Sequence, residues 1–394
     1  MERTRRPLFV LHQFLTSTVC WLIAFATVAP FACAQTYTVL HRFSAREGAH
    51  PHGGLFFDSE GHVHGIGTVG GRNKMGTVFS LSRTQRSVYS FTGPDGAFPL
   101  SELVEDSAGN LYGTTAMGGY GGGTVFKITP SGGETVLVKF SDPQFGNQPQ
   151  SSLVLDSEGN LYGTTLLGGI NFRGSRGLGT VFEITSTGTL ITLYRFTGLT
   201  DPDFADGEFP YAGLCRDQAG NLFGTTGGDG STTWGTVFEA TEDGGYAILY
   251  RFKGRSDGSQ PMAALTLDTA GNLYGTTKAG GVFDHGTVFK LDTNHIQSVL
   301  YSFTGGTDGG RPQSAVVFDS LGNLYGTTVL GGTSNRGTVY KLDLLGNEIV
   351  LHSFEGGTDG EYPYSGLMQD SRGHLYGVTS GGGAGHGVIF EITP

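Results

Sequence analysis

The sequence predicts an all-β fold built from seven copies of one unit, and three observations carry that prediction. A stretch typified by Gly159-Asn160-Leu161-Tyr162-Gly163-Thr164-Thr165, followed by a Gly-Gly step and a Gly-Thr-Val-Phe run, recurs seven times. Successive copies start 48 to 61 residues apart. Short apolar runs alternate with Gly, Asp and Asn turn residues. A fixed period of this size is typical of stacked supersecondary units. The copies start at Gly61, Gly109, Gly159, Gly220, Gly271, Gly322 and Gly373.

Each copy reads as four short strands, here named A to D in chain order. In the third copy, strand A covers 152–155, strand B 161–165, strand C 179–184 and strand D 190–196. Turn residues separate them, so neighbouring strands are expected to be antiparallel. Four antiparallel strands in about 50 residues are typical of a propeller blade. The sequence therefore predicts a seven-bladed β-propeller as a single domain over residues 36–394.

The two ends of the repeat region predict that the ring is closed. The last copy stops after a strand C at 388–392, so its blade has no strand D. Residues 36–43 precede the first copy and match the strands D at 247–252 and 349–354. We expect this amino-terminal strand to complete the last blade. An open stack would need polar caps at its ends.

The first 34 residues are predicted to be a signal peptide. Arg3, Arg5 and Arg6 form a basic head, an apolar run covers 19–31, and Ala32-Cys33-Ala34 offers a cleavage site. A twin-arginine signal or a lipid-modified Cys33 are alternatives. The apolar run is shorter than the roughly 20 residues of a membrane span. We expect a secreted, periplasmic or cell-envelope protein without a transmembrane segment in its mature chain.

Composition restricts the partners. The chain carries a formal charge of −11, which argues against a nucleic-acid partner. Cys215 is the one cysteine beyond the signal peptide, so no intramolecular disulfide is expected. Its register matches Val104, Val154 and Val317, which predicts a small apolar packing residue. We expect a monomer.

The repeat resembles the GloVer tandem-repeat family over essentially the whole mature chain. The family repeats carry GNLYGTT, a Gly-Gly step and GTVF, and the copies from Gly109 to Gly322 match this pattern. The first copy, from Gly61, is degenerate. The resemblance implies an exported protein, often with a carboxy-terminal anchor. The sequence after 388–392 lacks the apolar tail that such an anchor needs.

One aspartate per copy is predicted to be structural. An Asp lies three residues before the glycine that opens each copy, where its side chain can accept hydrogen bonds from the turn. A catalytic carboxylate is expected to break a repeat and not to belong to it. The seven are Asp58, Asp106, Asp156, Asp217, Asp268, Asp319 and Asp370.

Residues that differ between copies are the candidates for ligand binding. In a propeller the B–C and D–A loops are expected on one face, and the longest of them are insertions at 170–178 and 199–208. Arg, aromatic and His side chains there suit sugar or peptide ligands. Tolerated insertion without function is the alternative. The candidate ligand-binding residues are Phe172, Arg173, Arg176, Trp234, His285, Arg336 and His386.

Metal binding is a further hypothesis, at one acidic cluster and at two histidine pairs. Asp201, Asp203 and Asp206 precede a glycine and could hold Ca²⁺, although the spacing departs from an EF-type loop. His50 and His52, and likewise His62 and His64, lie two apart and could each share a metal ion. Substitution of structural residues is the competing interpretation of these histidines.

The sequence favours an exported binding or scaffold module for a polysaccharide or peptide, with no catalytic residue identified. The alternative is a secreted carbohydrate-active hydrolase or lyase, whose cleft would lie at the loops of blades 3 and 4. Glycosidases need two nearby carboxyl groups, and Asp203 and Glu208 belong to the acidic cluster that could supply them. A structural envelope protein is a third class.

Overall fold

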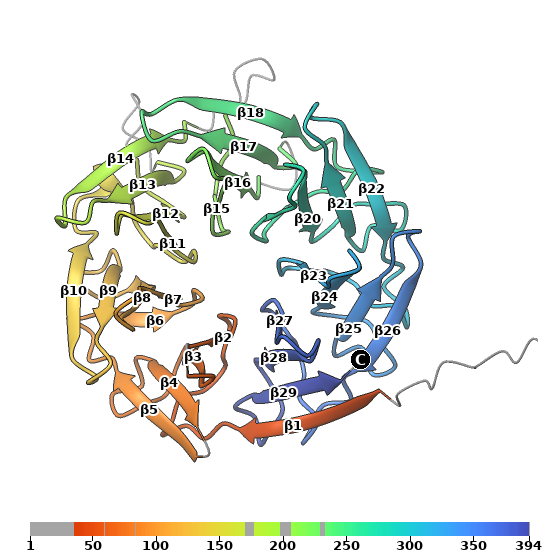
Figure 1. The fold of residues 1–394 in the computed structure, drawn as a ribbon, viewed down its shortest axis with the longest axis horizontal. Coiled ribbons are helices and arrows are strands. Elements are labelled where there is room, and N and C mark those ends of the chain that lie inside the picture. The colour runs from red at the N-terminus through yellow and green to blue at the C-terminus, as the bar shows by residue number, and fades with distance from the viewer. Residues whose placement is uncertain are drawn as a thin grey trace, which may run out of the picture. The chain divides into compact units, whose positions relative to one another are not determined.

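The computed structural model describes residues 35–58, 60–82, 84–169, 177–197, 206–228 and 233–393, within a compact unit covering 35–394. Seven antiparallel sheets surround a central axis in a seven-bladed β-propeller, as the sequence predicts (Figure 1). The described residues contain no α-helix and one 3-10 turn, η1 (Pro143–Phe145). None of the helical structure in this part of the chain is long and apolar enough to cross a membrane.

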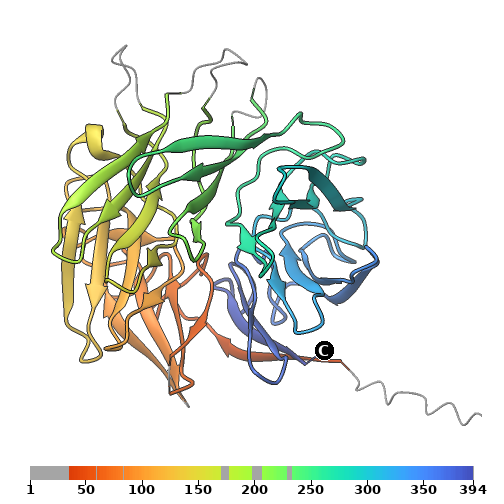
Figure 2. The same cartoon turned by 45° about the horizontal axis from the view of Figure 1, so that its top comes forward.

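The third blade illustrates the order of strands from the axis outward. It consists of β11 (Val154–Leu155), β12 (Leu161–Thr165), β13 (Thr180–Ile184) and β14 (Leu190–Arg195). Figure 2 gives an oblique view with the D strands outermost. The innermost strand is two residues shorter than predicted, and beside it the Ser151 hydroxyl donates to the Thr164 C=O and accepts from the Thr164 N–H.

The other blades repeat this order, and blade 2 adds the short strand β6 beside β8. Blade 1 comprises β2 (Phe56–Phe57), β3 (Val63–Gly67), β4 (Thr77–Ser82) and β5 (Thr84–Ser90). Blade 2 comprises β6 (Ala97–Pro99), β7 (Val104–Glu105), β8 (Leu111–Met117), β9 (Thr124–Ile128) and β10 (Glu134–Lys139). Blade 4 comprises β15 (Cys215–Arg216), β16 (Leu222–Thr226), β17 (Thr236–Ala240) and β18 (Tyr246–Arg251). Blade 5 comprises β19 (Thr266–Leu267), β20 (Leu273–Thr277), β21 (Thr287–Leu291) and β22 (Gln297–Ser302). Blade 6 comprises β23 (Val317–Phe318), β24 (Leu324–Thr328), β25 (Thr338–Leu342) and β26 (Glu348–Ser353).

Strands from both ends of the chain form blade 7, which confirms the predicted closure. The sheet order is β1 (Thr36–Arg42), β29 (Val388–Thr393), β28 (Leu375–Thr379) and β27 (Met368–Gln369). Thr36 pairs with Thr393 and Arg42 with Val388, in an antiparallel register with one bulge. Figure 1 shows β1 on the outside of β29. No edge of this blade is left without its outer strand.

The hydrophobic core consists of clusters between neighbouring blades, each built from both facing sheets. Between blades 4 and 5, for example, Val237 and Phe252 pack against Phe289 and Leu291. Cys215 lies at the margin of this cluster, and burial raises its pKa to about 12. This placement confirms the predicted apolar role of the thiol. Burying each such phenylalanine contributes roughly 1.5–3 kcal/mol.

Threonine hydroxyls join neighbouring blades at five of the seven interfaces. The first Thr of the repeated Gly-Thr-Thr donates to a backbone carbonyl of the next blade, as Thr164 does to Ala212 at 3.0 Å. Ile66 and Val378 occupy the same register, so the two interfaces that flank blade 1 are apolar at this point. The other donor–acceptor pairs are Thr114–Ser151, Thr225–Ala263, Thr276–Ser314 and Thr327–Ser365.

The repeated aspartates close the A–B turns, as predicted. Asp106 Oδ1 accepts the backbone N–H groups of Ala108 and Asn110, and its Oδ2 accepts the Asn110 amide and the Tyr112 hydroxyl. Partial burial opposes ionisation, but these hydrogen bonds outweigh it and lower the pKa of Asp106 to about 2. A carboxylate committed to four donors is a structural group.

Candidate ligand-binding sites

Several candidate residues fall on segments outside the described ranges. Phe172, Arg173 and Arg176 belong to the insertion in the third B–C loop, and Asp201 and Asp203 to the following D–A loop. Their roles stay predictions. On the described loops, backbone bridges join the D–A and B–C loops, for example Ser259 to Ala279 and Gly310 to Leu330.

The remaining ligand-binding candidates share one register, the residue before the glycine that opens strand C. Trp234, His285, Arg336 and His386 therefore lie on four successive blades and do not converge on one point. The first three pack over a glycine of the neighbouring D–A loop, respectively Gly254, Gly305 and Gly356.

Arg336 and His386 are also engaged by their surroundings. Arg336 pairs with Glu361, so much of its charge is neutralised within the protein. His386 lies edge-on to His50, with ring centroids 6.2 Å apart, and its Nδ1 is buried without a hydrogen-bond partner in the described part of the chain.

Trp234 lies on a groove between blades 4 and 5. The groove has a volume of about 570 Å³ and is lined by aromatic, charged and amide side chains. The B–C loop of blade 5 forms one wall and exposes Val282 and Phe283, which are 72% and 53% accessible. The other lining side chains include Arg255, Gln260 and Asp284.

The acidic candidates near the insertions are partly occupied. Asp206 Oδ2 accepts hydrogen bonds from the Tyr194 hydroxyl at 2.9 Å and the Thr197 N–H at 2.8 Å. Asp257 and Asp308 make equivalent bonds in other copies, so Asp206 belongs to the repeat. Glu208 accepts a hydrogen bond from Thr233. The other two residues of the calcium hypothesis, Asp201 and Asp203, lie outside the described residues, so that hypothesis stays a prediction.

His62 and His64 occupy the turn positions that Asn110 and Tyr112 fill in blade 2. Their ring nitrogens lie 3.0 Å and 2.8 Å from Asp58 Oδ2. Partial burial opposes ionisation of Asp58, but these bonds and the turn N–H groups lower its pKa to about 2. Over the described ranges, no three His, Cys, Asp or Glu side chains are arranged to hold a metal ion. This geometry supports structural substitution of the two histidines.

A second cavity lies on the axis of the ring. Its volume is about 280 Å³, and every blade contributes the segment that precedes its strand A. A proline opens each segment, and the residue before it has a positive φ of 50 to 58°. The N–H of that residue donates to the backbone carbonyl of the residue before the glycine that opens strand C. Gln260 donates in this way to Trp234 at 2.9 Å. This bond holds a backbone conformation that non-glycine residues rarely adopt.

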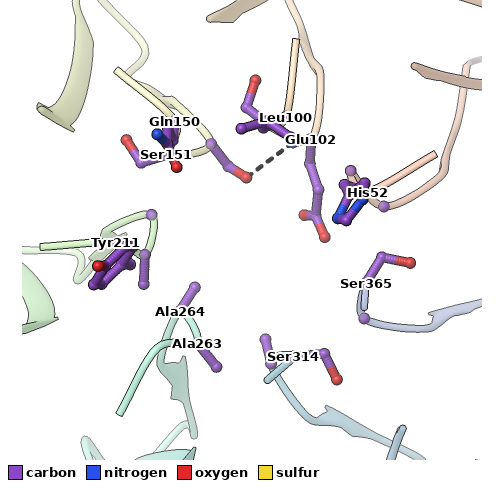
Figure 3. A pocket seen from close by; sticks show the side chains of 18 of the residues that line it. His52, Leu100, Glu102, Gln150, Ser151, Tyr211, Ala263, Ala264, Ser314 and Ser365 are labelled. Carbon is purple, nitrogen blue, oxygen red and sulfur yellow. Dashed lines mark hydrogen bonds between the residues drawn. The ribbon is translucent and has the colours of Figure 1, made fainter. Parts of the chain in front are cut away.

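Two rings of residues line this axial channel (Figure 3). The first ring consists of the residues that follow the prolines: His52, Leu100, Gln150, Tyr211, Met262, Gln313 and Tyr364. The second ring lies two residues further on: Gly54, Glu102, Ser152, Gly213, Ala264, Ala315 and Gly366. Residues two apart in an extended strand point to the same side.

His52 is the histidine of these rings, and Glu102 is their carboxylic acid. The His52 ring stacks on Tyr364 with centroids 4.7 Å apart, and burial, with a smaller effect of His50, lowers its pKa to about 4. Glu102 is exposed to solvent in the channel, and the protein around it displaces part of its hydration, which raises its pKa. His52 is therefore neutral at pH 7.

Apart from His52, the sequence predictions missed the channel residues. The signal that could identify them is the proline that precedes strand A in every copy: Pro51, Pro99, Pro149, Pro210, Pro261, Pro312 and Pro363. At the second-ring position the other copies carry Gly, Ala or Ser, so Glu102 is the residue that departs from the repeat.

The protein is thus a β-propeller with one cavity between two blades and one on the axis. The profile of the Gloeobacter/Verrucomicrobia repeat matches residues 26–218 and 209–394. The chain belongs to this repeat family, in agreement with the resemblance to the GloVer repeat. No curated protein sequence matches the chain.

Two solved structures share the fold at low sequence identity. One is the extracellular domain of a B. thetaiotaomicron protein assigned as a hybrid two-component system, with 12% identity, a TM-score of 0.60, and coverage of 91% of this chain and 41% of that one. The other is the extracellular domain of a protein from the same organism assigned as a one-component system, with 10% identity, a TM-score of 0.57, and coverage of 90% and 39%. This chain spans about two fifths of their length, and such likeness concerns the fold alone.

Proposed function

We propose that the protein is an exported binding module that holds a polysaccharide in the groove at Trp234. The observation that carries the proposal is the composition of this groove, in which an indole lies beside Arg255, Gln260 and Asp284. The loop that forms one wall also exposes Phe283. Export rests on the basic head, apolar run and cleavage site of residues 1–34.

The chemistry of these side chains suits sugars. An aromatic face packs against the apolar C–H face of a pyranose ring. Guanidinium, carboxylate and amide groups donate to and accept from the paired hydroxyls at the ring edge. A groove that mixes apolar walls with a few placed polar groups is typical of a ligand site. A peptide would use the same aromatic anchors, so the test includes it.

The test compares the chain from Gln35 with its Trp234→Ala variant on a glycan array and on a peptide array. We expect the parent to bind a subset of polysaccharides and Trp234→Ala to weaken that binding at least tenfold, because the indole supplies the largest contact area. Tyr120→Ala is the matched control, since Tyr120 is 86% exposed on the B–C loop of blade 2. Thermal unfolding checks that each variant is folded.

Three outcomes would overturn the proposal. They are binding confined to peptides, glycan binding that survives Trp234→Ala, and turnover of the bound polysaccharide, which would favour the hydrolase or lyase. Repeating the array with EDTA tests the calcium hypothesis, because a bridging Ca²⁺ at Asp201 and Asp203 would make glycan binding sensitive to the chelator.

A further inference from the structure

The axial channel contains one carboxyl group. Among the residues of its two rings, Glu102 is the acidic one, and His52 is neutral at pH 7. Among the residues that the structure describes, no Lys or Arg lines the channel. The carboxylate points into the channel beside His52 (Figure 3).

The neighbouring glycines make room for this carboxylate. A Cβ atom at Gly54 would overlap Glu102 Oε1, and one at Gly366 would lie 3.8 Å from the same oxygen. The Glu102 side chain, which belongs to blade 2, therefore extends over blade 1 toward blade 7. A bulkier residue at position 54 would displace the carboxylate from the axis.

The carboxylate has no partner in the described part of the chain. In this part of the chain, Glu102 makes one polar contact, in which its backbone N–H donates to Ser152 Oγ at 3.1 Å. A carboxyl group in a narrow channel has fewer water molecules around it than one on an open surface. A ligand that brings positive charge and N–H donors would stabilise its ionised form.

The side chains that line the channel suit an ammonium ion better than a metal ion. The channel offers a single carboxylate with aromatic rings and amides, whereas Ca²⁺ takes six to eight oxygen ligands. An ammonium group needs only one to three acceptors and is also attracted by the faces of aromatic rings. Tyr211, Tyr364 and the amides of Gln150 and Gln313 lie in the first ring.

We propose that the axial channel binds a small organic ammonium ion through the Glu102 carboxylate. The volume of about 280 Å³ restricts the ligand to a small amine. This site is separate from the groove at Trp234, and the proposal does not depend on the polysaccharide proposal.

The experiment is isothermal titration calorimetry of the chain from Gln35 at pH 7.5 with ethanolammonium chloride. Ethylene glycol is the neutral analogue, in which a hydroxyl replaces the ammonium group. We expect a dissociation constant on the order of 1 mM for ethanolammonium and at least tenfold weaker binding of ethylene glycol. The comparison uses the unaltered protein, so it does not depend on whether a variant folds.

Substitutions then locate the site. Glu102→Gln keeps the shape and removes the charge, and we expect it to weaken ethanolammonium binding at least tenfold. Glu158→Gln makes the same change on an exposed turn outside the channel and should leave the affinity unchanged, as should Trp234→Ala. Equal affinity for ethylene glycol, undiminished binding to Glu102→Gln, or no detectable ethanolammonium binding at tens of millimolar would overturn the proposal. Glu102-dependent binding of CaCl₂ that displaces the amine would also overturn it.

Discussion

At the scale of single residues, most polar side chains of the repeat are committed to fixed partners. The turn aspartates show this, because each oxygen of Asp106 accepts from two donors. Such residues repeat because the fold requires them in every blade. Functional candidates are the residues that depart from the repeat, and Glu102 and Trp234 belong to that class.

Tyr340 departs from the repeat without a visible benefit to stability. It lies in strand C of blade 6, where the other blades carry Phe, and its hydroxyl is buried without a partner in the described residues. Burial, with a smaller effect of Glu348, raises its pKa. A buried hydroxyl without a hydrogen bond costs about 1–3 kcal/mol.

We therefore predict that Tyr340→Phe raises the free energy of unfolding by about 1 kcal/mol, because it removes an unsatisfied polar atom and keeps the ring. Urea denaturation measures the change. The reciprocal control is Phe289→Tyr at the same register of blade 5, which should destabilise the protein by a similar amount. A loss of stability in Tyr340→Phe would imply that the hydroxyl has a partner that the described residues do not include.

At the scale of elements, side chains make hydrogen bonds that a regular sheet would make with its backbone. Ser151 replaces a backbone pair beside the axis, and Thr164 joins blade 3 to blade 4. The inner strands have two residues in all seven blades, and the segments that precede them line the channel.

We predict that Thr164→Val destabilises the protein by about 1–2 kcal/mol, because Val fills the same volume but leaves the Ala212 carbonyl without the Thr164 donor. Val378 shows that this register accepts a buried valine. Thr38→Val on the exposed side of β1 is the control and should change stability little. Urea denaturation compares the two variants. Equal effects would mean that the bond between blades contributes nothing measurable.

At the scale of the whole molecule, closure of the ring depends on β1. Tyr37 on this strand donates to the Asp359 carbonyl and stacks on His352 at 3.7 Å. It also packs with Phe354 and Phe390 between blades 6 and 7. The strand therefore completes one blade and covers the interface with another.

Deleting residues 35–43 should lower the melting temperature by about 10 °C or more relative to the chain that begins at Gln35. The deletion exposes the edge of β29 and part of an apolar cluster, and for a chain of this size 1 kcal/mol corresponds to a few degrees. Differential scanning calorimetry measures the shift. A synthetic peptide of residues 35–43 should restore part of it by pairing with β29. An unchanged melting temperature would contradict the closure as the source of stability.

The sequence alone determined the number of blades, the strand order and the closure by β1. These follow from local turn chemistry, from a last copy without strand D and from an additional strand D before the first copy. It also identified the turn aspartates, whose hydrogen bonds lie within six residues of each Asp. Only the tertiary structure decided which residues meet on the axis. His52, Glu102 and Gly366 are far apart in sequence, and closure of the ring brings their side chains and backbones to one channel. Likewise, the groove beside Trp234 depends on how two neighbouring loops fold against each other.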